Sequence, residues 1–120
     1  MKFLVIGGNA AGMSAASRVK RKSPDTEVVV LEQTHEVSYG ACGLPYYVAG
    51  LNNNLDLMRI RKADQFLANG VDLRLGCDVT GADFTAKTVS YTDENGEAHV
   101  ESYDKLLIAT GSSPKVPPIP

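Results

Sequence analysis

A single cysteine, Cys42, lies in the stretch SYGACGLPYYVAG (residues 38–50), between small residues and shortly before a proline. Gly43 and Pro45 are typical of the opening turn of a helix, because a proline there gives up no hydrogen bond. A thiol at or near a helix N-terminus has a stabilised thiolate and is therefore reactive. The alternative is a small buried apolar side chain, the common fate of a free cysteine. The local sequence leaves both interpretations open.

A glycine pattern at the start of the chain is typical of nucleotide binding. Gly7, Asn9 and Gly12 occupy the three positions of the G-x-G-x-x-G motif, with Asn9 in place of the middle glycine. In this motif the glycines allow a tight turn, a close approach of a pyrophosphate, and close packing of the helix on the strand. We expect Asn9 to keep the turn, because asparagine tolerates unusual backbone angles. The first helical turn, which includes Ala11, then offers unpaired N–H groups to a phosphate.

Glu32 follows Gly12 at the distance that the motif requires, at the end of the next predicted strand. An acidic residue at this position can accept a hydrogen bond from a ribose hydroxyl. The alternative is that the two glycines serve only a tight turn and that Glu32 is a solvated strand end. Because strand, turn, helix and acidic residue occur in the required order, the sequence favours nucleotide binding.

Cations gather near the end of the first predicted helix, namely Arg18, Lys20, Arg21 and Lys22. Such a cluster suits the binding of phosphate groups. Cations near a helix C-terminus also complement the helix dipole. The sequence does not separate these two interpretations.

The composition excludes several other classes of function. A net charge of −2 gives no overall attraction to nucleic acid or to an anionic membrane, and no segment approaches the length of a membrane span. Two cysteines and two distant histidines, His35 and His99, do not make a disulfide framework, and we expect no metal site. We predict that Cys77 is structural and that the protein is cytoplasmic, where a lone cysteine stays reduced.

The hydrophobic pattern predicts a parallel sheet that positions these residues. Residues 2–6 and 26–32 contain continuous apolar runs, typical of strands covered on both faces. Residues 10–22 carry apolar or small side chains at helical spacing, and a proline follows the end of this helix. Strand, glycine turn, helix and strand in this order predict a βαβ unit with a right-handed crossover.

The second half of the chain predicts a mixture of elements. A short helix is expected near Cys42, and another over residues 61–69 with Gly70 at its C-terminal cap. Residues 71–75 alternate strictly, as in a half-exposed or edge strand. Between residues 83 and 103, β-branched and aromatic segments flank the turn signal DENG (93–96), which predicts an antiparallel hairpin. A last buried strand is expected over residues 104–110, followed by a turn over residues 111–114.

Four segments in this order and spacing carry a family resemblance: VIGGNAAGMSAASRVKR, VVVLE, SYGACGLPYYVAG and YDKLLIATGSSPKVPPIP. They resemble the N-terminal flavin-binding segment of the pyridine nucleotide-disulfide oxidoreductases. The similarity is closest to the single-cysteine branch, which includes coenzyme A-disulfide reductases, NADH oxidases and peroxidases, and NADH-dependent persulfide reductases. It implies an α/β fold, a Rossmann-like FAD-binding domain that carries an antiparallel β-meander.

The resemblance also implies roles for individual residues. In that family the first βαβ unit holds the ADP part of FAD, which matches Gly7, Gly12 and Glu32 here. The backbone near Val79 would face the adenine, and the segment Ala109, Thr110 and Gly111 would pass close to the flavin pyrophosphate. Cys42 would be the redox-active sulfur beside the flavin, with NAD(P)H as the reductant.

The coenzyme A reductases bind their substrate with the far end of the first helix and the loop before the cysteine. The matching positions are Ser14, Arg18, Arg21 and Ser38. Many of these enzymes have asparagine directly before the cysteine, where this chain has Ala41. An NADH oxidase or peroxidase that cycles through a cysteine sulfenic acid is therefore an alternative, and a non-catalytic nucleotide-binding fragment is a second one.

Members of this family are longer than 120 residues. They continue into an NAD(P)H-binding domain, return to complete the flavin domain, and end in a dimerisation domain. The resemblance therefore implies that residues 1–115 are the N-terminal part of an FAD-binding domain, incomplete at its C-terminus. Residues 116–120 would begin a linker, and the full-length protein would be a homodimer.

Overall fold

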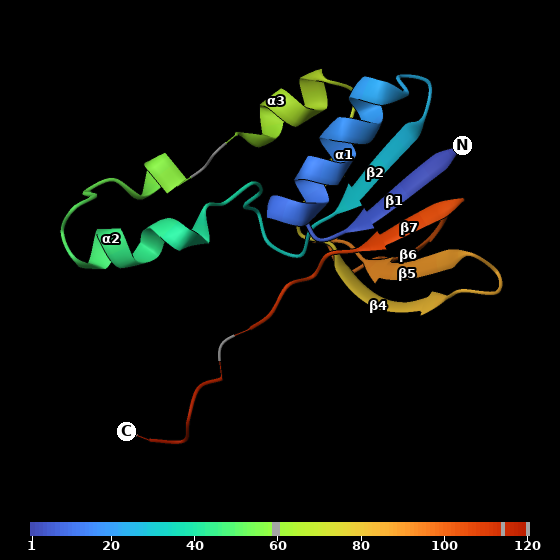
Figure 1. Cartoon of the computed structure of the whole chain (residues 1–120). Coiled ribbons are helices and arrows are strands. Elements are labelled where there is room, and N and C mark those ends of the chain that lie inside the picture. The colour runs from blue at the N-terminus through green and yellow to red at the C-terminus, as the bar shows by residue number, and fades with distance from the viewer. Residues whose placement is uncertain (59–60, 114, 120) are drawn as a thin grey trace.

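The computed structural model describes residues 1–58, 61–113 and 115–119. A parallel sheet lies between helices on one face and an antiparallel sheet on the other (Figure 1). Pro114 and Pro120, which belong to the predicted turn and linker, lie outside the described residues. None of the described helices is both long and apolar enough to cross a membrane.

The parallel sheet has the strand order β3-β2-β1-β7. The strand β1 (Lys2–Ile6) pairs with β2 (Glu27–Leu31) on one side and with β7 (Lys105–Ile108) on the other. The helix α1 (Ala10–Lys22) connects β1 to β2, so the predicted βαβ unit is confirmed. The alternating residues 71–75 form β3 (Asp72–Arg74), which is an edge strand as expected.

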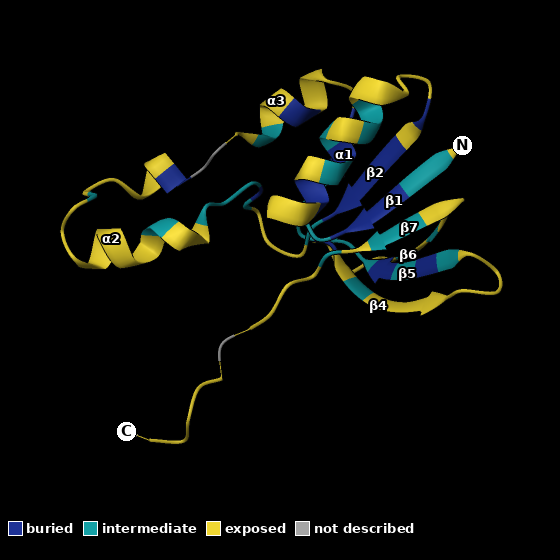
Figure 2. Cartoon of the chain, in the orientation of Figure 1, coloured by how far each residue is buried: buried dark blue, intermediate teal, exposed yellow. Residues whose placement is uncertain are grey.

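The side chains of β1 and β2 divide between two cores, because successive residues of a strand point to opposite faces. The set that faces the helices α1 and α3 (Ala63–Ala68) consists of Val5, Val28 and Val30. The set that faces the antiparallel sheet consists of Leu4, Ile6, Val29 and Leu31. Both faces of these strands are covered (Figure 2), which explains their continuously apolar sequences.

The antiparallel sheet contains β4 (Asp78–Asp83), β5 (Thr88–Thr92) and β6 (Ala98–Ser102). The predicted hairpin connects β5 to β6, with Gly96 at a φ of +82° and the N–H of Asp93 donating to the carbonyl oxygen of Glu97 at 2.9 Å. The sheet begins earlier than the expected residue 83. The reason is that β4 is largely exposed and has no apolar alternation, so that its pairing with β5 alone defines it as a strand.

A charged network connects the two sheets. Glu101 on β6 accepts hydrogen bonds from Lys2 on β1 and, at 2.8 Å, from Arg74 on β3. The same guanidinium donates to the hydroxyl of Tyr91 at 2.8 Å. Burial acts to raise the pKa of Glu101, but the hydrogen bonds and charges of Lys2 and Arg74 outweigh it and hold that pKa below its ordinary value.

An arm of short helices extends from the end of the sheet (Figure 1). It contains a 3₁₀ turn (Ala41–Gly43), the helix α2 (Leu44–Val48) and a second 3₁₀ turn (Leu55–Met58). The N–H of Gly40 donates to the carbonyl oxygen of Met58 at 2.6 Å, and Met58 is buried. This contact closes the arm at its base, whereas the apolar side chains at its tip are exposed (Figure 2).

The helix predicted over residues 61–69 is shorter in the structure and corresponds to α3. Gly70 follows its C-cap with a φ of +88°, the left-handed conformation expected of a glycine at this position. Lys62, one of the residues predicted to be helical, instead has the extended backbone of an N-cap.

Candidate functional site

The turn between β1 and α1 requires a glycine at position 7, and the first turns of α1 require a glycine at position 12. Gly7 has a φ of +106°, which side-chain-bearing residues rarely adopt, and a Cβ atom there would lie 2.1 Å from the carbonyl oxygen of Ala109. A Cβ atom at Gly12 would lie 1.8 Å from the carbonyl oxygen of Gly7. The two glycines therefore let α1 begin directly against the turn and let the chain after β7 cross over it.

Asn9 is the N-cap of α1, and its backbone is extended, with a φ of −105° and a ψ of −151°. The turn is therefore kept with Asn9 at this position, as expected, although its backbone angles are ordinary ones. The side chain of Asn9 is exposed and makes no capping hydrogen bond. The first-turn residues Ala10 and Ala11 are also exposed, so this end of α1 is open to solvent.

Glu32 is fixed by hydrogen bonds from two directions. One carboxylate oxygen accepts from the N–H of Gly8 at 2.9 Å. The other accepts from the N–H and the hydroxyl of Thr34, at 2.6 and 2.7 Å. The carboxylate of Glu32, the predicted ribose anchor, is thus held in place beside the glycine turn.

Six of the nine residues predicted to bind the cofactor line a cavity of about 440 Å³, here called the turn cavity, whereas Gly12 is buried in α1. The turn cavity lies at the carboxyl ends of β1, β2 and β7, where ligands of open α/β sheets bind. Its lining includes Gly7, Asn9, Glu32, Ala109, Thr110 and Gly111. Val79 lines a neighbouring cavity of about 230 Å³ that shares Gly7, Glu32 and Thr110 with it. Ala11 is exposed on the first turn of α1 beside Asn9.

The glycine lining of the turn cavity and the nearby N-terminus of α1 suit the phosphates of a dinucleotide. Gly7, Gly8 and Gly111 in the cavity lining have no side chains, so a ligand can approach the backbone there. The exposed first turn of α1 points its positive dipole end to the same side. The residues present therefore fit the pyrophosphate and ribose of FAD.

Cys42 lies in the 3₁₀ turn Ala41–Gly43, directly before Gly43, the N-cap of α2. It is exposed, so the alternative of a packed apolar cysteine is wrong for this residue. The loop before it is joined to the glycine turn, since the N–H of Ser38 donates to the carbonyl oxygen of Gly8 at 2.9 Å. Tyr39 of the same loop lines the turn cavity.

Cys77, in contrast, is 5% exposed and packs in the core between the two sheets. Burial raises the pKa of its thiol, which opposes formation of a thiolate. The prediction that Cys77 is structural is consistent with this environment.

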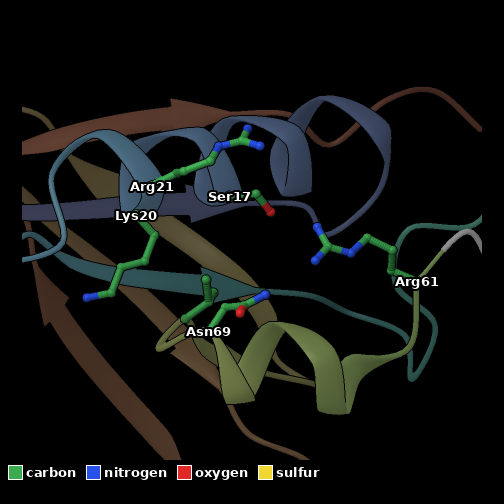
Figure 3. A pocket seen from close by; sticks show the side chains of 6 residues that line it. Ser17, Lys20, Arg21, Arg61 and Asn69 are labelled. Carbon is green, nitrogen blue, oxygen red and sulfur yellow. The ribbon is translucent and has the colours of Figure 1, made fainter.

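All four residues predicted to bind the substrate line one cavity of about 410 Å³, here called the arginine cavity. They are Ser14, Arg18, Arg21 and Ser38. The cavity lies between α1, the loop before Cys42 and the segment before α3. Arg61, whose side chain extends toward α1 in Figure 3, also lines this cavity, although no spacing in the sequence relates this residue to α1.

The hairpin brings together Asp93, Glu97 and His99, whose potential ligand atoms lie within 4.8 Å of one another. A carboxylate oxygen of Asp93 lies 2.7 Å from Nε2 of His99, and the ring of His99 stacks on Tyr91. These contacts stabilise the turn. The sequence predicts no metal site because the two histidines lie far apart along the chain, whereas the hairpin brings His99 close to two carboxylates.

The chain is similar to known proteins over its whole length. The family model of the pyridine nucleotide-disulphide oxidoreductases matches residues 1–120. An NAD(P)H coenzyme A polysulfide/persulfide reductase of Pyrococcus horikoshii is 43% identical over 118 residues, which make up 98% of this chain and 26% of that protein. An NADH oxidase of Lactococcus lactis is 34% identical over 120 residues, which make up 100% of this chain and 27% of that protein.

The fold is also similar to that of a solved structure, an NAD-dependent persulfide reductase from A. fulgidus. The TM-score is 0.92 at 41% sequence identity, and the match covers 99% of this chain and 23% of that one. The chain thus spans about a quarter of the length of the relatives it matches.

Proposed function

The chain belongs to the pyridine nucleotide-disulphide oxidoreductase family, and on this premise we propose that it is the N-terminal part of an FAD-dependent, NAD(P)H-using enzyme that reduces coenzyme A disulfide or a related small disulfide or persulfide. The observation that carries the proposal is the hydrogen bond between Ser38 and Gly8. This hydrogen bond connects two parts of the site. One is the loop that leads to the exposed thiol of Cys42, and the other is the glycine turn that lines the turn cavity.

We propose that the turn cavity holds FAD. The N–H groups at the start of α1 and the backbone of residues 109–111 would bind the pyrophosphate, and Glu32 would accept a hydrogen bond from the ribose. Val79, in the neighbouring cavity, would face the adenine. When bound, FAD supplies the two electrons that return a disulfide-level sulfur to a thiol.

Cys42 is the proposed nucleophile. Its thiolate would attack one sulfur of the substrate disulfide, so that a Cys42–substrate disulfide forms while the substrate S–S bond breaks and one thiolate leaves. A proton from solvent converts the leaving thiolate to a thiol. The exposure of Cys42 supports this role, because the incoming disulfide must approach its sulfur in line with the bond that breaks.

The arginine cavity is the proposed site for the phosphate-bearing part of coenzyme A. Arg18 and Arg21 provide guanidinium groups that suit phosphate oxygens, and Ser14 and Ser38 provide hydroxyl groups. Because Ser38 also belongs to the loop before Cys42, a ligand in this cavity can extend toward the thiol.

The decisive experiment uses the full-length protein loaded with FAD. We expect NAD(P)H oxidation to depend on coenzyme A disulfide and to release two thiols per NAD(P)H. The Cys42→Ser variant should lose this turnover while keeping the absorbance of bound flavin. Undiminished turnover in this variant would refute the role of Cys42.

The second candidate function is an NADH oxidase, favoured by the similarity to the NADH oxidase of L. lactis and by Ala41 before the cysteine. In this case Cys42 would cycle through a sulfenic acid. Mass spectrometry separates the candidates: a coenzyme A adduct on Cys42 supports the reductase, and one added oxygen supports the oxidase. An unreactive thiol supports a non-catalytic fragment. A cytoplasmic location and a homodimer remain predictions.

A further inference from the structure

The hairpin between β5 and β6 carries three potential metal ligands that the proposed function does not use. They are Asp93, Glu97 and His99, and one ligand atom of each lies within 4.8 Å of the others. An imidazole nitrogen and two carboxylate oxygens form the kind of mixed donor set that binds zinc and similar divalent transition ions. With a neutral imidazole the set carries two negative charges, which balance the charge of a divalent cation.

The ring of His99 is positioned by a buried neighbour. The register of the two strands sets His99 opposite Tyr91, and the two rings stack with their centroids 5.2 Å apart. Tyr91 is 5% exposed, and its hydroxyl accepts a hydrogen bond from Arg74 at 2.8 Å. The stacked ring of His99 presents Nε2 to Asp93, 2.7 Å from a carboxylate oxygen. Packing against the core therefore orients the nitrogen ligand.

The carboxylate of Asp93 is oriented by the backbone of the turn. Its Oδ1 accepts hydrogen bonds from the N–H groups of Asn95 and Glu97, at 2.9 and 3.0 Å. These two bonds leave Oδ2 as the oxygen that faces His99. Oδ2 of Asp93 and Nε2 of His99 thus belong to side chains that are already ordered, which lowers the entropy cost of binding an ion.

Glu97 is the third potential ligand and the one that can adjust. It is exposed, and within the part of the chain that the structure describes its carboxylate has no hydrogen-bond partner. Two ligands of one tetrahedral zinc ion lie about 3.4 Å apart, since each bond is about 2.1 Å long. The pair of Asp93 and His99 must therefore open by about 0.7 Å, and Glu97 must turn inward by at most roughly 1.5 Å. An exposed side chain without a partner makes this movement at little cost.

We propose that Asp93, Glu97 and His99 form a binding site for a divalent transition ion such as Zn²⁺. Nε2 of His99 and one oxygen of each carboxylate are the ligands, and water fills the remaining position. The imidazole selects against Mg²⁺ and Ca²⁺, which take oxygen ligands. The ion replaces the hydrogen bond between His99 and Asp93 and connects the turn to β6. None of the three residues lines the turn cavity or the arginine cavity, so the ion takes no part in the proposed reduction of a disulfide.

Titration calorimetry with Zn²⁺ tests the site on the full-length, FAD-loaded protein without a histidine tag. Cys42→Ser is the background for every variant, because an exposed thiol also binds zinc. In this background His99→Gln should weaken zinc binding by more than about tenfold. Glu97→Gln should weaken it as well, and this exposed side chain can be replaced without disturbing the hairpin. His35→Gln is the matched control: His35 also lies 3.0 Å from a carboxylate, that of Glu94, but belongs to no group of three ligands among the described residues.

The proposal is overturned if the Cys42→Ser background binds no zinc, if binding is unchanged in His99→Gln or Glu97→Gln, or if His35→Gln causes an equal loss. Electron paramagnetic resonance with Cu²⁺ gives a second readout that does not depend on affinity. Coupling of the copper to an imidazole nitrogen should appear in the background and in His35→Gln and disappear in His99→Gln. An unchanged nitrogen signal in His99→Gln would contradict the assignment of this imidazole as a ligand.

Discussion

Replacing Gly12 by alanine tests whether the contact between α1 and the glycine turn determines the stability of the fold. The added Cβ would lie 1.8 Å from the carbonyl oxygen of Gly7, so backbone atoms must move apart by roughly 1 Å, a shift that costs about 1–3 kcal/mol or more. The better helix propensity of alanine offsets about 1 kcal/mol at most. We expect a net loss of about 2 kcal/mol and a fall in Tm of about 8 °C.

Urea unfolding followed by circular dichroism measures this loss directly. Gly81→Ala is the matched control, because nothing lies within 4 Å of a Cβ atom at that glycine, and surface changes of this kind stay within about 0.5 kcal/mol. A Gly12→Ala variant as stable as the control would refute the argument that this glycine exists to let the helix approach the turn.

Three further predictions concern the site and the core. Glu101→Gln should lower the free energy of unfolding at neutral pH. Because the pKa of Glu101 is depressed in the fold, its contribution to stability is present above the ordinary value of 4.5 and is lost as the pH falls through the folded pKa. The unfolding curves of the variant and the wild type should therefore converge in acid. Glu32→Gln should weaken FAD binding about tenfold by flavin fluorescence, since the carboxylate that Gly8 and Thr34 orient is replaced by a poorer acceptor; unchanged affinity would rule out a ribose anchor. Cys77→Ala should cost about 1 kcal/mol of stability by removing a buried sulfur, while turnover and the reactivity of Cys42 stay intact; a loss of turnover at unchanged flavin content would contradict its structural role.

The sequence predicted the elements whose burial is complete. The runs in β1 and β2 are continuously apolar because both faces of these strands are covered, and the turn between β1 and α1 is marked by glycines that no other residue can replace. Burial on both faces and tight backbone contacts each restrict which residue types can occur, so they can be recognised in the sequence. The glycine motif predicts Gly7, Gly12 and Glu32 as cofactor residues, whereas only the family resemblance predicts Val79 and residues 109–111; Gly7, Glu32 and residues 109–111 line the turn cavity.

The rest of the fold and the site depends on contacts between distant segments. The strand β4 is mostly exposed and carries no alternation, so its start could not be placed from the sequence. Arg61 precedes α3 and lines a cavity with residues of α1, and its guanidinium lies over the ring of the buried Phe66. The backbone at Asn9 is ordinary, although a motif position usually filled by glycine suggested otherwise.

The central position of β1 has a consequence for synthesis on the ribosome. This strand pairs with β2, which follows soon after it, but its other edge pairs with β7, which is among the last described segments. A nascent chain that has not yet released β7 from the exit tunnel exposes one row of unpaired N–H and C=O groups along β1. Chaperone protection of nascent chains should therefore end only once residue 108 has emerged, which ribosome-stalled chains of increasing length can measure.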